Sequence, residues 1–245
     1  MSRWRFPTEF SDLLTKKGIK ILQRKDDRVC LSFASSKRYF VSVQGALDKG
    51  KAGKCMQVLD EKLYPYLREI CSKIPPETIS RMSENYSEQL PKTLHMKTAY
   101  LDSTRARSYK IATEIGLIDM LSSKSFLEFA QSLTGLRLDS DLGYQVICYE
   151  NGHYVGPHND HHPEDESTKK GFVDLHITLA NDSVDHQWIV YEESGHFSKI
   201  VDTTRTGTVT AYRLPFWHYV TPLAAKSGRE RRARRWLLLG TFNFL

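Results

Sequence analysis

Hydrophobic positions change their spacing about halfway along the chain. Before residue 136, apolar residues recur at the three- and four-residue intervals of amphipathic helices, and after it they form short runs with period two. The helical pattern covers residues 13–22, 56–74, 104–116 and 122–135, and residues 28–43 predict one or two strands. Pro75 and Pro76 end the second predicted helix, and Gly135 is a C-cap for the last one.

The second half of the chain has the pattern of an all-β sandwich or barrel, with several short strands separated by turn residues. The predicted strands are residues 144–149, 172–179, 187–191, 208–213, 218–221 and 235–242. The sequence therefore predicts an α+β fold, with helices in the first half and a β structure in the second.

One predicted strand, residues 172–179, has polar side chains on one of its faces. Asp174, His176 and Thr178 alternate with aliphatic residues, so the two sets point to opposite sides of the sheet. If the aliphatic face packs under the helices, the polar face lines an interior, and a polar interior in a small barrel indicates a ligand cavity. The alternative is a half-exposed strand whose polar side faces water, and the pattern alone leaves both open.

Length and composition indicate an ordinary globular protein. With 245 residues, 40% of them apolar, the chain can form one large domain or one domain with a helical extension. No apolar run reaches the roughly 20 residues that cross a bilayer, and the first residues lack the apolar stretch of a secretory signal, so we expect a cytoplasmic protein.

Charge and cysteine usage add little that is specific. Much of the net charge of +6 comes from a cluster of arginines between residues 229 and 235, which is typical of a solvated hairpin but also suits phosphate contacts. The cysteines are widely spaced, and neither a zinc ribbon nor a redox motif is indicated; they are Cys30, Cys55, Cys71 and Cys148.

A His-x-Asp motif is the first indication of chemistry. His158 and Asp160 lie two residues apart, so on an extended segment both would point to the same side and could bind one ion. His218 is the best third ligand, because the strand pattern before it allows the chain to return beside the motif. Two histidines and one carboxylate with open positions are the ligand set of non-haem Fe(II) oxygenases. The competing pair His162 and Glu164 is interrupted by a proline and lies in an acidic, loop-like segment.

These residues resemble the Fe(II)/2-oxoglutarate-dependent dioxygenases, and within them the prolyl-hydroxylase-like branch. The first part of the resemblance is a tyrosine-containing strand, a glycine turn and His-x-Asp; the second is a histidine followed by Val, Pro and a basic residue before an aromatic one. The matching positions are Tyr149, Gly152, Tyr154, His158 and Asp160, then His218, Val220, Pro222, Arg235 and Trp236. A helix ending at residues 126–135 also resembles this branch, so the resemblance covers roughly residues 115–245.

The resemblance implies a double-stranded β-helix (jelly-roll) barrel that holds Fe(II), with 2-oxoglutarate and O2 as co-substrates. By it, His158, Asp160 and His218 hold the metal, and Arg235 binds the distal carboxylate of 2-oxoglutarate through its planar fork. Because the preceding loop is long, Arg234 remains the alternative; alternation places Arg235 with Leu237 and Leu239 only if the strand boundary is right.

Other pocket residues are also implied by position. Tyr149 and Thr178 fall where relatives contact 2-oxoglutarate. Gln145, His176 and Asp174 are expected near the substrate or the co-substrate. His176 is equally consistent with a buried histidine that pairs with Asp174 or with a backbone group. The usual Gly-Gly turn after the third strand is not evident, which leaves residues 186–200 poorly placed.

The expected organisation is a mainly helical region over residues 1–100, with a short hairpin at most, packing on a dioxygenase core over residues 101–245. The expected reaction is hydroxylation of a C–H bond in a small molecule or peptidyl residue, while 2-oxoglutarate becomes succinate and CO2. The fold does not determine the substrate, so a free amino acid, a peptidyl residue and a natural-product intermediate all remain candidate substrates.

Three alternatives remain. An AlkB-type nucleic-acid dealkylase would suit the basic charge, but those relatives carry a second arginine six residues after the first, where this chain has Thr241. A metal-binding barrel without oxygenase activity, or one that uses zinc hydrolytically, would accept the same ligands; the sequence signals no obvious additional general base, although Glu164 or Asp174 could serve. A scaffolding protein would leave the combination of metal ligands and Arg235 unexplained.

Overall fold

The computed structural model describes residues 4–26, 29, 39–72, 93–139, 143–160 and 171–245. Its main feature is one curled sheet, mostly antiparallel, in the order β1-β11-β7-β14-β5-β3-β6-β12-β9-β10, with β2 paired to β3 and β4 to β14. The strands are β1 (Phe40–Val43), β2 (Arg68–Ser72), β3 (Leu94–Tyr100), β4 (Leu138–Asp139), β5 (Tyr144–Glu150), β6 (Tyr154–His158), β7 (Phe172–Ala180), β9 (Trp188–Glu193), β10 (His196–Asp202), β11 (Thr208–Leu214), β12 (His218–Val220) and β14 (Arg234–Phe244). A separate small pair joins β8 (Val184–His186) to β13 (Ala224–Ala225).

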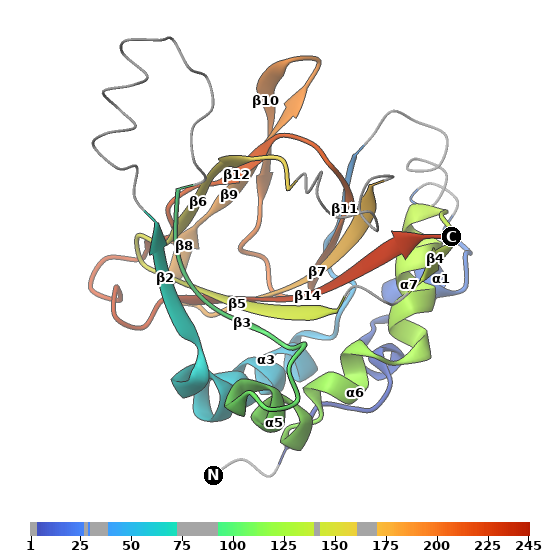
Figure 1. Cartoon of the computed structure of the whole chain (residues 1–245), viewed down its shortest axis with the longest axis horizontal. Coiled ribbons are helices and arrows are strands. Elements are labelled where there is room, and N and C mark those ends of the chain that lie inside the picture. The colour runs from blue at the N-terminus through green and yellow to red at the C-terminus, as the bar shows by residue number, and fades with distance from the viewer. Residues whose placement is uncertain (1–3, 27–28, 30–38, 73–92, 140–142, 161–170) are drawn as a thin grey trace.

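Helices cover one outer side of this sheet, next to β3, β5 and β14 (Figure 1). They are the 3-10 helix η1 (Phe10–Leu13), α1 (Lys16–Leu22), α3 (Lys49–Val58), the π-helix η2 (Leu59–Leu63), the 3-10 helix η3 (Tyr64–Tyr66), α5 (Arg107–Glu114), α6 (Leu117–Leu121) and α7 (Lys124–Thr134). Among the described residues, no helix has the length and apolar character needed to span a membrane.

The predicted two-sided strand has the arrangement that a cavity requires. All four aliphatic residues of β7 from Val173 to Leu179 belong to the large core that also contains Phe126 and Phe129 of α7. Asp174 and His176, on the opposite face, are buried and line a cavity. The reading in which this face meets open solvent is therefore wrong.

The ends of the predicted helices follow local sequence signals. The Ser123 side chain accepts a hydrogen bond from the backbone of Phe126 at the start of α7, and Gly135 ends the helix at φ 71°, where only glycine lacks a steric penalty. The predicted helix over residues 13–22 is instead η1 followed by α1, because Thr15 caps a new helix by accepting from Gly18.

The predicted helix over residues 56–74 was wrong at its C-terminal end. The helix passes through η2 and η3, and Arg68–Ser72 is the strand β2; residues 73 and 74 lie outside the described residues. The physical reason is Pro65, in the first turn of η3, which has no backbone N–H to donate within a longer helix. The chain extends directly afterwards, at Leu67.

The β part is larger than the sequence pattern indicates. All six predicted strands are present, and β1 confirms the end of the prediction for residues 28–43, of which residues 28 and 30–38 lie outside the described set. The structure adds β2, β3, β4, β6, β8, β10 and β13, and most of β10 lies in residues 186–200, which the sequence placed poorly. Strands from both sides of residue 100 pair in one sheet, since β3 pairs with β5; a division into residues 1–100 and 101–245 stays a prediction.

We expect Gly240→Ala to destabilise the protein, because Gly240 of β14 faces α7. A Cβ at this position would lie 2.5 Å from Cε1 of the fully buried Phe126, so the ring must move within a packed core. Overpacking of this kind costs about 1–3 kcal/mol. Denaturant unfolding of Gly240→Ala measures it, with Gly53→Ala in α3 as the control, since nothing lies within 4 Å of that added Cβ. Equal stability of the two variants would contradict the packing.

Candidate metal centre

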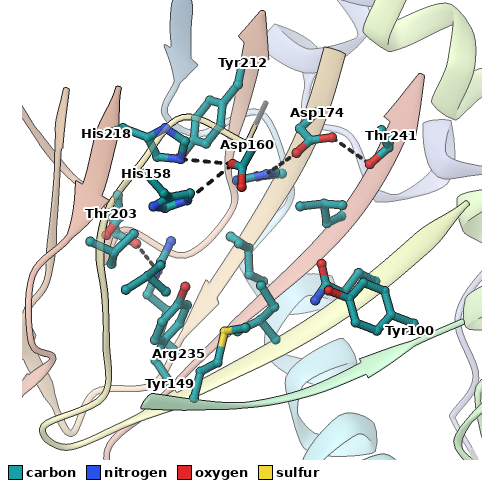
Figure 2. Close-up of a pocket in the computed structure, with 18 of the residues that line it drawn as sticks. Tyr100, Tyr149, His158, Asp160, Asp174, Thr203, Tyr212, His218, Arg235 and Thr241 are labelled. Atoms are coloured by element: carbon teal, nitrogen blue, oxygen red, sulfur yellow. Dashed lines mark hydrogen bonds and ion pairs between the residues drawn. The ribbon is translucent and has the colours of Figure 1, made fainter. Parts of the chain in front are cut away.

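Three predicted ligands come together at the pairing of β6 with β12. His158 and His218 are directly opposite each other in this pair, and their rings lie 4.2 Å apart between centroids. Oδ2 of Asp160 lies 3.3 Å from Nε2 of His158 and 3.6 Å from Nε2 of His218. Figure 2 shows the three side chains converging at one end of a cavity. They form one of two groups among the described residues whose geometry could hold a metal ion.

Backbone carbonyl groups orient both imidazole rings. Nδ1 of His158 lies 2.7 Å from the carbonyl oxygen of Gly156, and Nδ1 of His218 lies 3.0 Å from that of Phe216. A carbonyl oxygen only accepts, so each ring donates from Nδ1 to the backbone and directs its Nε2 toward Asp160. This is the usual arrangement of metal-binding histidines, whose other nitrogen donates to a fixed group.

Asp160 reaches the site differently from the way the motif predicts. The strand β6 ends at His158, and Asp160 has a φ of 52°, in the left-handed region. Asp is among the residues that tolerate this region, and non-glycine residues held there cluster at functional sites. The carboxylate thus points back toward the histidines because of a turn and not because of strand alternation.

The three side chains border a cavity of about 300 Å³. Its walls are the inward faces of β3, β5, β7 and β14, including Met96, Ile147, Leu237 and Leu239. The wall combines these apolar side chains with convergent polar and charged groups, which fix the orientation of a ligand in small-molecule sites.

Arg235 places a buried cation in this cavity, and only 2% of the residue is exposed. Its Nε donates to the carbonyl oxygen of Thr203 at 2.8 Å, and its Nη1 donates to Oε1 of Gln187 at 2.9 Å. Among the described residues, no carboxylate forms an ion pair with it. Burial lowers the pKa of the guanidinium, but arginine stays protonated in proteins. The side chain is therefore a positive charge that faces the cavity without a negative partner from the described chain.

Arg234 points the other way, which decides the register of this strand. Its guanidinium lies 3.4 Å from Asp60 and 3.4 Å from Glu150, and it stacks over the Tyr64 ring on the helical side. Arg235, Leu237 and Leu239 share the cavity face, as alternation from Arg235 predicts. The other arginines of the cluster, Arg229, Arg231 and Arg232, are exposed.

Tyr149 and Thr178 lie differently with respect to the cavity. Tyr149 is buried, lines the cavity and has Arg235 over its ring at 5.2 Å. Burial raises its pKa to about 12, so its hydroxyl stays protonated and can donate a hydrogen bond. Thr178 is buried beside Leu237 of β14 but is not one of the residues that border the cavity.

The end of the cavity farther from Arg235 carries polar groups. Thr241 donates to Oδ1 of Asp174 at 2.6 Å, and Gln145 lines this region while its amide donates to Thr98. Nε2 of His176 is 3.8 Å from Oδ2 of Asp174, and within the described part of the chain neither ring nitrogen of His176 has a hydrogen-bond partner. A pairing of His176 with backbone is therefore not observed, and this end of the cavity has unused hydrogen-bonding capacity.

Several cavity residues were missed by the sequence reasoning. Thr203 and Gln187 hold Arg235, and Tyr212 lines the wall and contacts His176, with ring centroids 4.2 Å apart and a tilt of 60°. No motif marks the first two, because they act through a carbonyl and an amide at strand ends. Tyr212 had a signal, since it alternates inward on a predicted strand. His161, His162 and Glu164 lie outside the described residues.

Comparisons with known proteins bear on the fold. No family model matches the sequence, and no curated protein matches it. Solved structures do match. A prolyl-4-hydroxylase from Pseudomonas putida superimposes with a TM-score of 0.53 at 12% identity, covering 92% of this chain and 99% of that one. A prolyl hydroxylase from Trichoplax adhaerens, in complex with a hypoxia-inducible factor peptide fragment, gives 0.53 at 14% identity, covering 94% of each chain.

A third similar structure has a different activity. SnoN, a non-haem α-ketoglutarate-dependent epimerase from nogalamycin biosynthesis, superimposes with a TM-score of 0.53 at 14% identity, covering 93% of this chain and 81% of that one. At these identities the comparisons establish the fold. The predicted double-stranded β-helix barrel and its likeness to the prolyl-hydroxylase-like branch are confirmed at that level.

We expect Thr241→Val to lower the free energy of unfolding, because it removes the donor to a largely buried carboxylate, that of Asp174. An unsatisfied buried acceptor costs about 1–3 kcal/mol. Thr241→Ser keeps the hydroxyl and is the control. Denaturant unfolding at neutral pH compares the two, and a Val variant as stable as the Ser variant would show that the hydrogen bond contributes nothing.

Proposed function

We propose that this protein is an Fe(II)- and 2-oxoglutarate-dependent dioxygenase that hydroxylates a C–H bond of a small molecule or of a peptidyl residue. The observation that carries the proposal is the buried charge of Arg235, which has no carboxylate partner among the described residues and lies in the same cavity as two histidines and a carboxylate. A buried cation is strongly unfavourable unless it is paired, so the cavity favours a ligand that brings a carboxylate.

The side chains present fit an iron centre. His158, Asp160 and His218 would hold Fe(II), since two imidazoles and one carboxylate leave positions open for other ligands. A zinc enzyme would accept the same three groups, but it would have no use for Arg235. The guanidinium therefore favours the oxygenase over a hydrolytic zinc site.

The cation and its neighbours fit 2-oxoglutarate. Arg235 would bind the distal carboxylate through its fork, and Thr203 and Gln187 hold that fork in place. The protonated Tyr149 hydroxyl would donate to the same ligand. Thr178 does not border the cavity, so the proposal gives it no contact with 2-oxoglutarate. When bound, Fe(II) with O2 and 2-oxoglutarate supplies the oxidising chemistry, in which 2-oxoglutarate becomes succinate and CO2.

The remaining part of the cavity would take the substrate. Its apolar walls exclude water from the reacting carbon, while Gln145, His176 and Asp174 would position polar groups of the substrate. The similar structures include one bound to a peptide and one from natural-product biosynthesis, so both a peptidyl residue and a small molecule remain within the proposal.

Anaerobic titration with Fe(II) and 2-oxoglutarate tests the centre directly. We expect the weak visible charge-transfer band of an iron-bound 2-oxoglutarate, because the open positions admit the chelate. His158→Ala and Asp160→Ala should abolish the band, and His186→Ala, at a partly exposed histidine of β8 that does not border the cavity, should leave it unchanged. Absence of the band in the wild-type protein would contradict the proposal.

Substitution of each of the neighbouring residues Arg234 and Arg235 tests which of them binds 2-oxoglutarate. Arg235→Gln should weaken 2-oxoglutarate binding by at least about tenfold, the effect of losing one charge-assisted hydrogen bond. Arg234→Gln, one residue away on the opposite face, should leave binding unchanged. Calorimetric or band titrations of the two folded variants measure this, and equal effects would contradict the assigned register.

Succinate formation measured against amino acids, peptides and cell extracts identifies the substrate class. We expect one class to raise turnover above the uncoupled background, with Asp174→Asn lowering the stimulated rate more than the background rate. Salt-dependent binding of single-stranded DNA or RNA, with stimulation by alkylated nucleic acid, would instead support the dealkylase alternative.

A further inference from the structure

A second histidine and carboxylate cluster lies on the outer side of the sheet. Glu69 of β2, His95 of β3 and His153 of the turn before β6 each place one possible ligand atom within 4.8 Å of the others. Along β3, Met96 and Tyr100 line the cavity, so His95 points to the opposite side. This cluster is therefore separated from the proposed iron centre by the sheet itself.

Its geometry resembles that of the proposed iron centre. The rings of His95 and His153 lie 4.2 Å apart between centroids and are tilted by 40°, compared with 4.2 Å and 51° for His158 and His218. Oε1 of Glu69 lies 2.8 Å from Nε2 of His95. Two imidazoles and one carboxylate are again gathered from three separate elements, which is the donor set that zinc and similar ions bind.

His153 provides an observation independent of the clustering. The residue is only 4% exposed, and its buried Nδ1 forms no well-aligned hydrogen bond with a described residue, although the Cys148 backbone lies close enough to the ring to oppose the fall of its pKa. Buried polar atoms in proteins are almost always satisfied, so this nitrogen indicates a missing partner. Burial, and next the nearby His95, lowers the pKa of His153, which keeps the ring in the neutral form that binds metal.

The other polar groups on this face are compatible with a cation. The hydrogen bond from His95 lowers the pKa of Glu69, which stays a carboxylate. The Lys97 ammonium lies 2.8 Å from Glu150, so its charge is already neutralised. Cys71, whose Cα pairs with that of His95, is an exposed free thiol on the same face.

We propose that Glu69, His95 and His153 form a second metal site, for a divalent transition-metal ion of the zinc type. Such an ion links β2, β3 and the turn that leads into β6, the strand that ends at His158. Its role is to brace this turn from outside the barrel, and it does not depend on oxygenase activity.

Metal binding to a tag-free protein tests the second site. The His158→Ala/Asp160→Ala/Cys71→Ser background removes the iron centre and the nearby thiol. We expect this protein to bind one Zn²⁺ or Co²⁺ per chain in equilibrium dialysis, and the ion to raise its Tm. The Co²⁺ complex should show ligand-field absorption in the visible range.

His95→Gln in that background should weaken binding by at least about tenfold, as removal of a metal ligand does. Glu69→Gln, at an exposed position, provides a second variant that leaves the core untouched. The control is His186→Gln, because His186 forms a similar 2.8 Å pair with Asp185 without a second histidine.

The outcomes are distinct from those of the iron experiment. Binding lost in His95→Gln and kept in His186→Gln supports the site even if no charge-transfer band is ever seen. No binding in the background protein, or binding that His95→Gln leaves unchanged, overturns it.

Discussion

The site depends on the register of β14, because adjacent side chains of this strand point to opposite faces of the sheet. This strand pairs with β5 on one side and β7 on the other, so its register is fixed twice. Trp236, Leu238 and Phe242 pack into the helical core, and the alternate residues Arg235, Leu237, Leu239 and Thr241 face the cavity. A slip by one residue would bury the Arg234 charge where Arg235 now lies and place Trp236 in the cavity. The helical layer therefore determines which arginine the cavity receives.

The buried guanidinium of Arg235 has no carboxylate partner among the described residues, so it is stable only because other polar groups replace the water that it loses. Burying an ion carries a penalty of several kcal/mol even after relaxation, so a carbonyl and an amide must compensate it in the ligand-free protein. Thr203 and Gln187 do so with neutral acceptors, which leave the net charge intact. A carboxylate partner from the chain would have neutralised the charge that the proposed ligand needs.

The parts of this architecture that the sequence predicts are those with a local signal. Strand alternation predicted the inward residues of β7, and the spacing of His158 and Asp160 with distant His218 predicted the cluster. Features that depend on the path of the chain in space were not predictable: the left-handed turn at Asp160, and the strand β2 after Pro65. Gln187 was not predictable for the same reason, because the hydrogen-bond partners of its side-chain amide are more than thirty residues away in the sequence.

Gln187 also shows how the proposed ligand-binding groups are held at a fixed separation. Its Oε1 accepts from Arg235, while its Nε2 donates to the carbonyl oxygens of His153 at 3.2 Å and Thr221 at 3.0 Å. His153 precedes β6 and Thr221 follows β12, the two strands that carry His158 and His218. One buried amide thus joins the cation to the backbone of both histidine-bearing strands. Because its donors and its acceptor are all used, the distance between cation and metal ligands is set by a rigid group, as recognition of one small dianion by two separate contacts requires.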